Sequence, residues 1–300
     1  MSALAVTIIG GYLGAGKTAL VNRMLRQAEG ARIAVLVNEF GELPIDEDLI
    51  EAREDDLISI AGGCVCCSFG SDLTAALLKI AALEPKPDHI VIESSGVALP
   101  GAIASTVDLS DGLRVGGIVV LADALNIRAQ ARDEYIGDTI ERQIADADII
   151  VLTKTDLIDQ AEADAVRSWL AQKRPETPVE GQAPNSVLLG AFGAGEARAS
   201  GIHHDGAYES VVMKFDAPCD VAALSRRLTD PSLGIVRAKG YVSDVSGRVA
   251  LLQLAGKRVE ITFPDAPGDA GLVCIGPKIR FNADALQALA AGRATNRPSK

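Results

Sequence analysis

Short apolar runs alternate with longer helical stretches over the first half of the chain. The runs are rich in valine and isoleucine and end at turn residues: AVTII, RIAVLV, LISI, HIVIE, GGIVVLAD and DIIVLT. Between them, apolar residues recur at helical spacing in KTALVNRMLRQA, SDLTAALLKIAAL and AEADAVRSWLAQK. This alternation predicts an α/β domain over residues 1–173, with a mainly parallel sheet that helices cover on both faces.

The pattern changes after Lys173. Residues 174–206 are rich in proline, glycine and alanine and have little periodicity, which predicts a linker containing a short helix. Strand-like runs then return in YESVVMKFD, GIVRAKGYV, RVALLQLA, KRVEITF and LVCIGPKIRF, with helical stretches in CDVAALSRRLTD and NADALQALAA. We expect a smaller α+β domain over residues 207–292, with a helix-covered antiparallel sheet, and a disordered tail over residues 293–300.

Composition narrows the classes of function. The chain has 300 residues, 48% of them hydrophobic, which fits a soluble globular protein of two domains. Its formal net charge of -11 argues against a nucleic-acid-binding surface and against attraction to anionic lipid. The apolar N-terminal run lacks a positively charged segment and breaks at glycines long before it could span a bilayer. We therefore expect a cytoplasmic protein with no nucleic-acid or membrane partner.

The stretch GYLGAGKT, residues 11–18, matches the phosphate-binding pattern GxxxxGK[ST] and lies between a predicted strand and a predicted helix. Backbone N–H groups of such a loop surround phosphate oxygens, and the helix N-terminus favours the same negative charge. Lys17 is expected to reach the β- and γ-phosphates, and the Thr18 hydroxyl to coordinate Mg²⁺. The predicted nucleotide-binding residues of this loop are Gly11, Gly14, Ala15, Gly16, Lys17, Thr18 and Ala19.

Two later strands end in residues suited to the same nucleotide. In HIVIESSG, Glu93 is placed to touch Mg²⁺ directly or through water, and Gly96 to lie near the γ-phosphate. In DIIVLTKTD, the Asp156 carboxylate suits the two adjacent N–H donors of guanine, and the Lys154 stem suits the face of a purine ring. Thr153 stands where guanine-binding loops more often have asparagine. The predicted catalytic residues are Lys17, Thr18 and Glu93.

Three of the five cysteines, Cys64, Cys66 and Cys67, follow a glycine pair in GGCVCC. Their thiolates are soft ligands for Zn²⁺ or Cu(I), with a fourth donor from water or elsewhere in the fold. Alternatives remain open: structural zinc, a reversible disulfide at the CxxC spacing, or buried sulfur. Glu39 and Glu42, in the preceding acidic segment, are expected to contact Mg²⁺ or to give an oxygen to the metal, a solvated acidic loop being the alternative.

Taken in order, GYLGAGKT, NEFGE, GGCVCC, ESSG and TKTD resemble the CobW family of P-loop GTPases, which are related to the nickel-insertion GTPases of urease and hydrogenase maturation. The later stretch IVRAKGYV, residues 235–242, resembles the strand that opens the C-terminal domain of that family. The resemblance implies a P-loop NTPase domain that hydrolyses GTP to GDP and phosphate with Mg²⁺. It also implies a metallochaperone that holds zinc, or else cobalt or nickel, and delivers it to a client protein. By this carry-over Cys64, Cys66 and Cys67 bind the metal. Together with Glu42 of the acidic segment they are the predicted metal ligands.

Two other functions use the same nucleotide motif. One is a GTPase regulator that delivers no metal and keeps zinc for structure or sensing. The other is an ATP-dependent kinase of a small metabolite, against which Asp156 and the cysteines argue. No residue stands out as a base for the attacking water, so we expect a low intrinsic rate. The sequence leaves the oligomeric state open.

Four single residues are expected to be structural. Cys219 and Cys274 are predicted to be small apolar side chains, and Trp169 and Phe215 to pack in cores. The adjacent His203 and His204 are predicted to be exposed linker residues.

Overall fold

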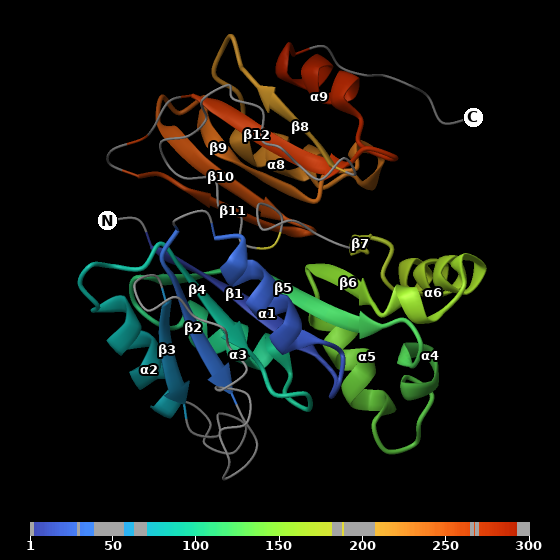
Figure 1. Ribbon diagram of the computed structural model, residues 1–300. Coiled ribbons are helices and arrows are strands. Elements are labelled where there is room, and N and C mark those ends of the chain that lie inside the picture. The colour runs from blue at the N-terminus through green and yellow to red at the C-terminus, as the bar shows by residue number, and fades with distance from the viewer. Residues whose placement is uncertain are drawn as a thin grey trace. The chain divides into compact units, whose positions relative to one another are not determined.

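Figure 1 shows the fold of the chain in a computed structural model, which describes residues 3–28, 31–38, 57–62, 71–181, 188, 208–264, 267 and 270–292. The chain divides into two compact units, Met1–Leu189 and Gly190–Lys300. The expectations for His203 and His204 and for the tail over residues 293–300 lie outside the described residues.

The described strands of the first unit form a seven-stranded sheet in the order β3-β2-β4-β1-β5-β6-β7. Every pair of neighbouring strands in it is parallel, which confirms the predicted sheet. Both faces of the sheet are covered, so nearly every strand position whose burial is described is buried. This burial explains why the strands are continuous apolar runs. The strands are β1 Leu4–Gly11, β2 Ile33–Asn38, β3 Leu57–Gly62, β4 His89–Glu93, β5 Leu113–Asp123, β6 Ile149–Thr153 and β7 Val179–Glu180.

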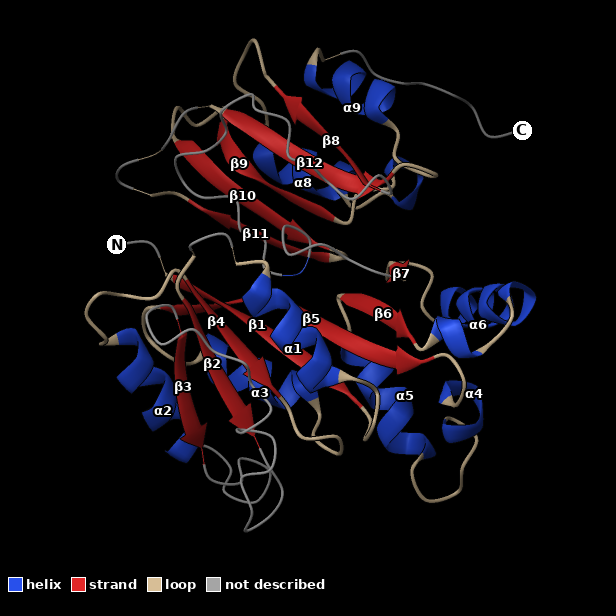
Figure 2. Cartoon of the chain, in the orientation of Figure 1, coloured by secondary structure: helices blue, strands red, loops and turns tan. Residues whose placement is uncertain are grey.

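Helices lie on both faces of this sheet. Figure 2 shows α1 on one face, with α3 and α5 on the other. The described helices of the unit are α1 Lys17–Arg26, α2 Ser71–Ala81, α3 Pro100–Asp108, α4 Ile127–Gln130, α5 Gly137–Asp146 and α6 Gln160–Lys173, with a 3₁₀ turn, η2, at Thr155–Leu157. β7 follows α6 and pairs with β6, so the sheet continues beyond Lys173.

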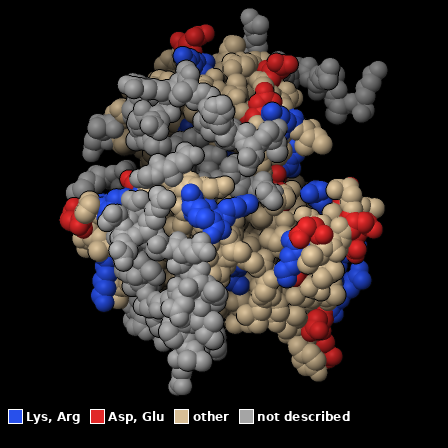
Figure 3. All heavy atoms as spheres, viewed as in Figure 1, with Lys and Arg blue, Asp and Glu red and all other residues tan. Residues whose placement is uncertain are grey.

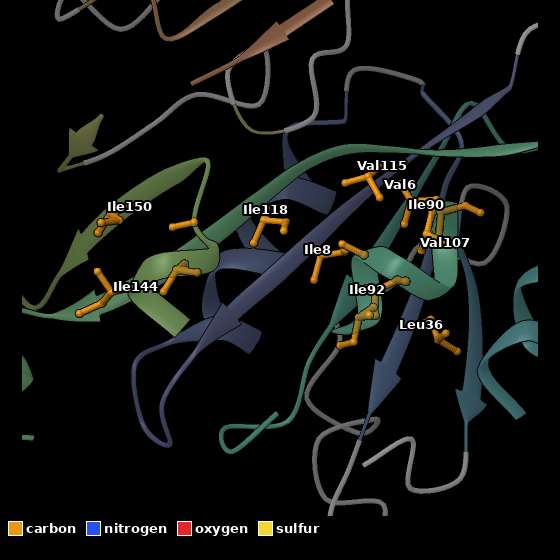
Figure 4. Close-up of a cluster of buried hydrophobic side chains, with 14 of the residues drawn as sticks. Val6, Ile8, Leu36, Ile90, Ile92, Val107, Val115, Ile118, Ile144 and Ile150 are labelled. Atoms are coloured by element: carbon orange, nitrogen blue, oxygen red, sulfur yellow. The ribbon is translucent and has the colours of Figure 1, made fainter. Parts of the chain in front are cut away.

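The main core lies between the sheet and the face covered by α3 and α5. Figure 4 shows side chains of this cluster, among them Ile8 and Ile92 from neighbouring strands, Val107 of α3 and Ile144 of α5. Each of these four side chains is at most 1% exposed. Trp169 of α6 packs against the same cluster, as predicted.

The second unit is a smaller α+β domain, as predicted. Its described strands form an antiparallel sheet in the order β11-β10-β9-β12-β8. Cys274 is fully buried in its core, and Cys219 and Phe215 pack against that core, which confirms their structural role. The elements are β8 Tyr208–Met213, α8 Val221–Leu228, η3 Pro231–Leu233, β9 Arg237–Ser243, β10 Val249–Ala255, β11 Arg258–Thr262, β12 Gly271–Pro277 and α9 Ala283–Ala290.

A glycine in β9 permits the close pairing of β9 with β12. A Cβ atom at Gly240 would overlap the carbonyl oxygen of Gly271 and lie 2.7 Å from the Cα atom of Leu272. Both neighbours are backbone atoms, which cannot move without disrupting the sheet. The glycine in the stretch IVRAKGYV is therefore required by packing.

Charged side chains of both signs are interspersed on the described surface that faces the viewer in Figure 3. Exposed ion pairs such as Lys173 with Glu141, at 2.6 Å between Nζ and Oε1, contribute little to stability. None of the described helices is both long enough and apolar enough to cross a membrane.

The core of the first unit predicts a large difference between two leucine substitutions. Leu36 in β2 is 0% exposed, whereas Leu109, after α3, is 88% exposed. Leu36→Ala should lower the free energy of unfolding by about 2–5 kcal/mol, because it removes buried methyl groups and leaves a cavity. Leu109→Ala, the matched control, should change it by less than about 0.5 kcal/mol. Urea denaturation measures both, and equal effects would contradict the assignment of this core.

Candidate functional site

The motifs predicted to bind nucleotide meet at one edge of the parallel sheet. Because β1, β4, β5 and β6 are parallel, their carboxyl ends lie at the same edge, and ligands of open α/β sheets bind there. The phosphate-binding loop follows β1, the ESSG segment begins at the end of β4, and the TKTD segment begins at the end of β6.

The loop between β1 and α1 depends on glycines at two positions. Gly14 and Gly16 have φ angles of 72° and 94°, in the left-handed region that favours glycine. Gly16 is the N-cap of α1, so the helix begins at Lys17 with its free N–H groups facing the loop. The loop is closed by a hydrogen bond of 3.1 Å from the Ala15 N–H to the Tyr12 carbonyl. This is the backbone conformation that the sequence motif predicts.

Lys17 is buried in this loop, at 9% exposed. Its Nζ atom donates to the Gly11 carbonyl at 2.9 Å and to the Tyr12 carbonyl at 3.4 Å. The ammonium group is therefore held over the loop, where its positive charge favours phosphate oxygens.

Thr18 and Glu93 are brought into contact, although they are far apart in the sequence. The Thr18 hydroxyl donates a hydrogen bond of 2.8 Å to Oε1 of Glu93, which is 4% exposed. A hydroxyl and a carboxylate oxygen at the end of a phosphate-binding loop are ligands of the kind that Mg²⁺ prefers. The donor set therefore fits the ion that the sequence predicts.

The ESSG segment packs directly on the phosphate-binding loop. A Cβ atom at Gly96 would lie 2.7 Å from the backbone nitrogen of Leu13, so this position admits glycine only. The side-chain amide of Gln143 donates to the carbonyls of Gly96 and Ala98, at 3.0 and 2.8 Å. Gln143 is 2% exposed and was not predicted. Its polar side chain lies on the buried face of α5, beside Ile140 and Ile144, and this break in the apolar pattern was the available indication.

The TKTD segment is tied to the phosphate-binding loop through Thr153. The Thr153 hydroxyl is 2.9 Å from the carbonyl oxygen of Ala15 and 3.3 Å from that of Ala122. Lys154, the next residue, has a φ angle of 57°, which is rare outside glycine. Asp156 follows in the 3₁₀ turn and is exposed. A threonine thus connects the two loops at the position where asparagine is more frequent.

Asp123, the last residue of β5, is a buried acid that the sequence analysis did not single out. Its carboxylate accepts hydrogen bonds from Lys154 Nζ at 2.8 Å, Asn126 Nδ2 at 3.0 Å and the Leu125 N–H at 3.0 Å. Burial raises the pKa of Asp123, but the hydrogen bonds and the charge of Lys154 outweigh it and hold this pKa below its ordinary value. The carboxylate is therefore ionised at neutral pH. Like Glu93, it ends an apolar strand run, which was the available indication.

The predicted metal ligands Cys64, Cys66, Cys67 and Glu42, together with Glu39, lie outside the described residues. Among the residues that are described, no group of three or more His, Cys, Asp or Glu side chains is arranged to hold a metal ion.

The chain matches two family models. The CobW/HypB/UreG nucleotide-binding domain matches residues 5–180. The chain belongs to this family. The cobalamin synthesis protein cobW C-terminal domain matches residues 208–292. These matches confirm the resemblance seen in the sequence, and this member of the family is a P-loop GTPase.

Relatives of known name are similar over different shares of the chain. The zinc chaperone CobW of Sinorhizobium sp is 31% identical over 88% of this chain and 89% of its own length. The zinc chaperone YjiA of Escherichia coli is 35% identical over 63% of this chain and 61% of its own length. The crystal structure of Zn(II)-bound YjiA GTPase from E. coli aligns with 98% of this chain and 100% of that chain, at 22% identity and a TM-score of 0.45.

The contact between Gly96 and Leu13 predicts a loss of turnover. Gly96→Ala should lower the rate of GTP hydrolysis at least ~10-fold, because the added methyl group must displace one of the two loops, and displacements of ~1 Å can cost about 100-fold. Phosphate release under saturating GTP measures the rate.

Gly116→Ala is the matched control for this substitution. Gly116 lies in β5, where the nearest atom to an added Cβ is 3.4 Å away, so the methyl group fits. A Gly96→Ala protein as active as Gly116→Ala would contradict close packing of the two loops.

Proposed function

We propose that this GTPase is a metallochaperone that binds a transition metal at Cys64, Cys66 and Cys67 and delivers it to a client protein. Zinc is the first candidate, since the relatives from Sinorhizobium and E. coli are named zinc chaperones, and cobalt or nickel comes next. Three adjacent thiolates suit such an ion and leave a fourth position open for exchange. Glu42 is the candidate for an additional oxygen ligand.

The observation that carries this proposal is the register of three neighbouring strands. Asn38 at the end of β2 pairs with Gly62 at the end of β3, and Val37 pairs with Glu93 at the end of β4. Neighbouring strands are ~4.8 Å apart, so the end of β3 lies ~10 Å from the end of β4. Cys64 follows Gly62 by two residues in the sequence, a reach of ~7 Å at most. The strand that leads into the cysteines therefore ends two strand positions from Glu93, which is proposed to hold Mg²⁺.

This proximity supports coupling between nucleotide and metal. The acidic segment that contains Glu42 begins directly after β2, between the end of β3 and Glu93 in the sheet order. A segment that the γ-phosphate orders is a common way for a GTPase to change a neighbouring site. We infer that GTP and GDP states hold the transferred metal with different affinity.

We assign the nucleotide contacts as the sequence predicts. Gly11, Gly14, Ala15, Gly16, Lys17, Thr18 and Ala19 of the loop bind the phosphates, and Gly96 lies near the γ-phosphate. Thr18 and Glu93 would hold Mg²⁺, directly or through water, and the ion would neutralise charge on the β- and γ-phosphates. The protein works in the cytoplasm in this proposal, since reduced thiolates persist there.

Binding of guanine by Asp156 predicts that a substitution at this residue changes the base preference of the protein. Asp156→Asn should lose affinity for GDP and gain affinity for xanthosine diphosphate, because xanthine has a carbonyl where guanine has its exocyclic amine, and an asparagine amide can donate to it. Competition against a fluorescent GDP analogue measures both, with ADP as the control ligand. Unchanged GDP affinity would contradict this role of Asp156. ADP binding by wild type as tight as GDP binding would favour the metabolite kinase.

Metal binding is tested by competition with a chromophoric chelator for Zn²⁺ and Co²⁺, in the presence of GDP and of a GTP analogue. Cys66→Ser should weaken Zn²⁺ binding at least ~100-fold, because one of three thiolates is lost. Cys219→Ser, which removes a thiol of the second unit, is the matched control and should leave affinity unchanged. Exchange of nucleotide should shift the wild-type affinity at least ~5-fold.

Delivery of the metal is tested by measuring its release. A fluorescent zinc indicator should report faster release during a single turnover of GTP than in the presence of GDP. Tight binding that is indifferent to nucleotide, with no release during turnover, would contradict delivery and favour the regulator with structural or sensory zinc.

A further inference from the structure

We propose that Asp123 positions the side chain of Lys154 for contact with the guanine ring, which makes Asp123 a determinant of nucleotide affinity. This inference rests on the part of the proposed function in which Lys154 and Asp156 bind the base.

The first support is the contact itself. Oδ2 of Asp123 lies 2.8 Å from Nζ of Lys154. The Asp123 side chain is 6% exposed, whereas that of Lys154 is 34% exposed. Lys154 thus reaches inward from the surface to a carboxylate at the end of the neighbouring strand. An exposed lysine with no such partner would extend into water.

Donors other than Lys154 also hold the Asp123 carboxylate in place. Asn126 Nδ2 donates to the same Oδ2 atom, and the Leu125 N–H donates to Oδ1. Both donors belong to the turn that follows β5, and the Asn126 N–H in addition donates to the Asp123 carbonyl at 3.1 Å. The Asp123 carboxylate therefore has a fixed position, and it holds the Lys154 ammonium group.

The backbone of Lys154 fits this arrangement. Its left-handed conformation, with φ 57° and ψ 29°, is uncommon for a residue with a side chain. Asp123 and Thr153 are partners in the register of β5 and β6, and the Ala124 N–H donates to the Thr153 carbonyl at 2.9 Å. The turn after β5 and the turn after β6 are thus joined by backbone pairing directly beside the ion pair.

Anchoring the ammonium group changes what the rest of the side chain can do. A free lysine samples many rotamers, and ordering it on binding lowers affinity by about 10-fold. With Nζ bound to Asp123, fewer conformations of the four-carbon stem remain, so its apolar side can lie on a ring at a lower entropic cost.

The test is nucleotide affinity in a double-substitution cycle on the full chain. Asp123→Asn keeps the shape of the side chain and removes the charge, and should weaken GDP binding about 10-fold. Lys154→Met keeps an unbranched stem without the ammonium group. In that background Asp123→Asn should have less than about 2-fold further effect, because its target is gone.

Two readouts separate positioning from a structural role. Inorganic tripolyphosphate occupies the phosphate-binding loop without a base, so its affinity should change less than about 2-fold in Asp123→Asn. Glu141→Gln, which breaks the exposed ion pair with Lys173 in the same unit, is the matched control and should leave GDP affinity unchanged.

Three results would overturn the inference. Equal loss of GDP and tripolyphosphate affinity would show that Asp123 supports the loop as a whole. Persistence of the full Asp123→Asn effect in the Lys154→Met background would show that it does not act through Lys154, and unchanged GDP affinity in Asp123→Asn would show that it does not act at all. Equal affinity of wild type for GDP and ADP would instead overturn the reading of guanine in the proposed function.

Discussion

Parallel pairing of β1 with both β4 and β5 is the constraint on which the nucleotide site depends. Ile9 is paired with Glu93 on one side, and Gly11 is paired with Leu121, two residues before Asp123, on the other. The phosphate-binding loop therefore emerges between two strands that each end in a buried acid. Neither acid is near the loop in sequence, and only the sheet brings them there.

Three buried side chains at this edge, Glu93, Asp123 and Gln143, form hydrogen bonds to partners that are distant in the sequence. A buried carboxylate or amide without partners costs several kcal/mol, so each such group specifies where its partner must lie. Glu93 accepts from the Thr18 hydroxyl, Asp123 accepts from Lys154, and Gln143 donates to the carbonyl of Gly96 in the ESSG segment and to that of Ala98 just beyond it. These hydrogen bonds, together with the apolar packing of residues such as Tyr12 and Ala15, fix the loops around the nucleotide relative to the strands.

The sequence predicted the local parts of this structure and missed the long-range ones. The strands of the parallel sheet and the conformation of the loop after β1 follow from apolar runs and from glycines at fixed spacing, which are properties of neighbouring residues. Gln143 and Asp123 were missed because their partners are 47 and 31 residues away, at Gly96 and Lys154. The sequence shows that Thr153 replaces the usual asparagine. Its hydrogen bond to the Ala15 carbonyl, which links the two loops, is seen only in the structure. Whether the cysteines bind metal stays a prediction, since they lie outside the described residues.

In the proposed function, the two acids beside β1 serve opposite ends of the nucleotide. Glu93 contacts a hydroxyl at the first turn of α1, on the side of the phosphates, whereas Asp123 contacts the lysine of the TKTD segment, on the side of the base. Glu93 also pairs with Val37 of β2, the strand that leads into the acidic segment and that pairs in turn with β3, which leads into the cysteines. Asp123 pairs with Thr153 of β6. In the proposed function, the γ-phosphate would thus lie on the side of β1 whose strands lead into the proposed metal ligands, and the base would lie on the opposite side of β1. Such an arrangement would let the phosphates act on the cysteine segment while the base-binding side keeps the nucleotide in place.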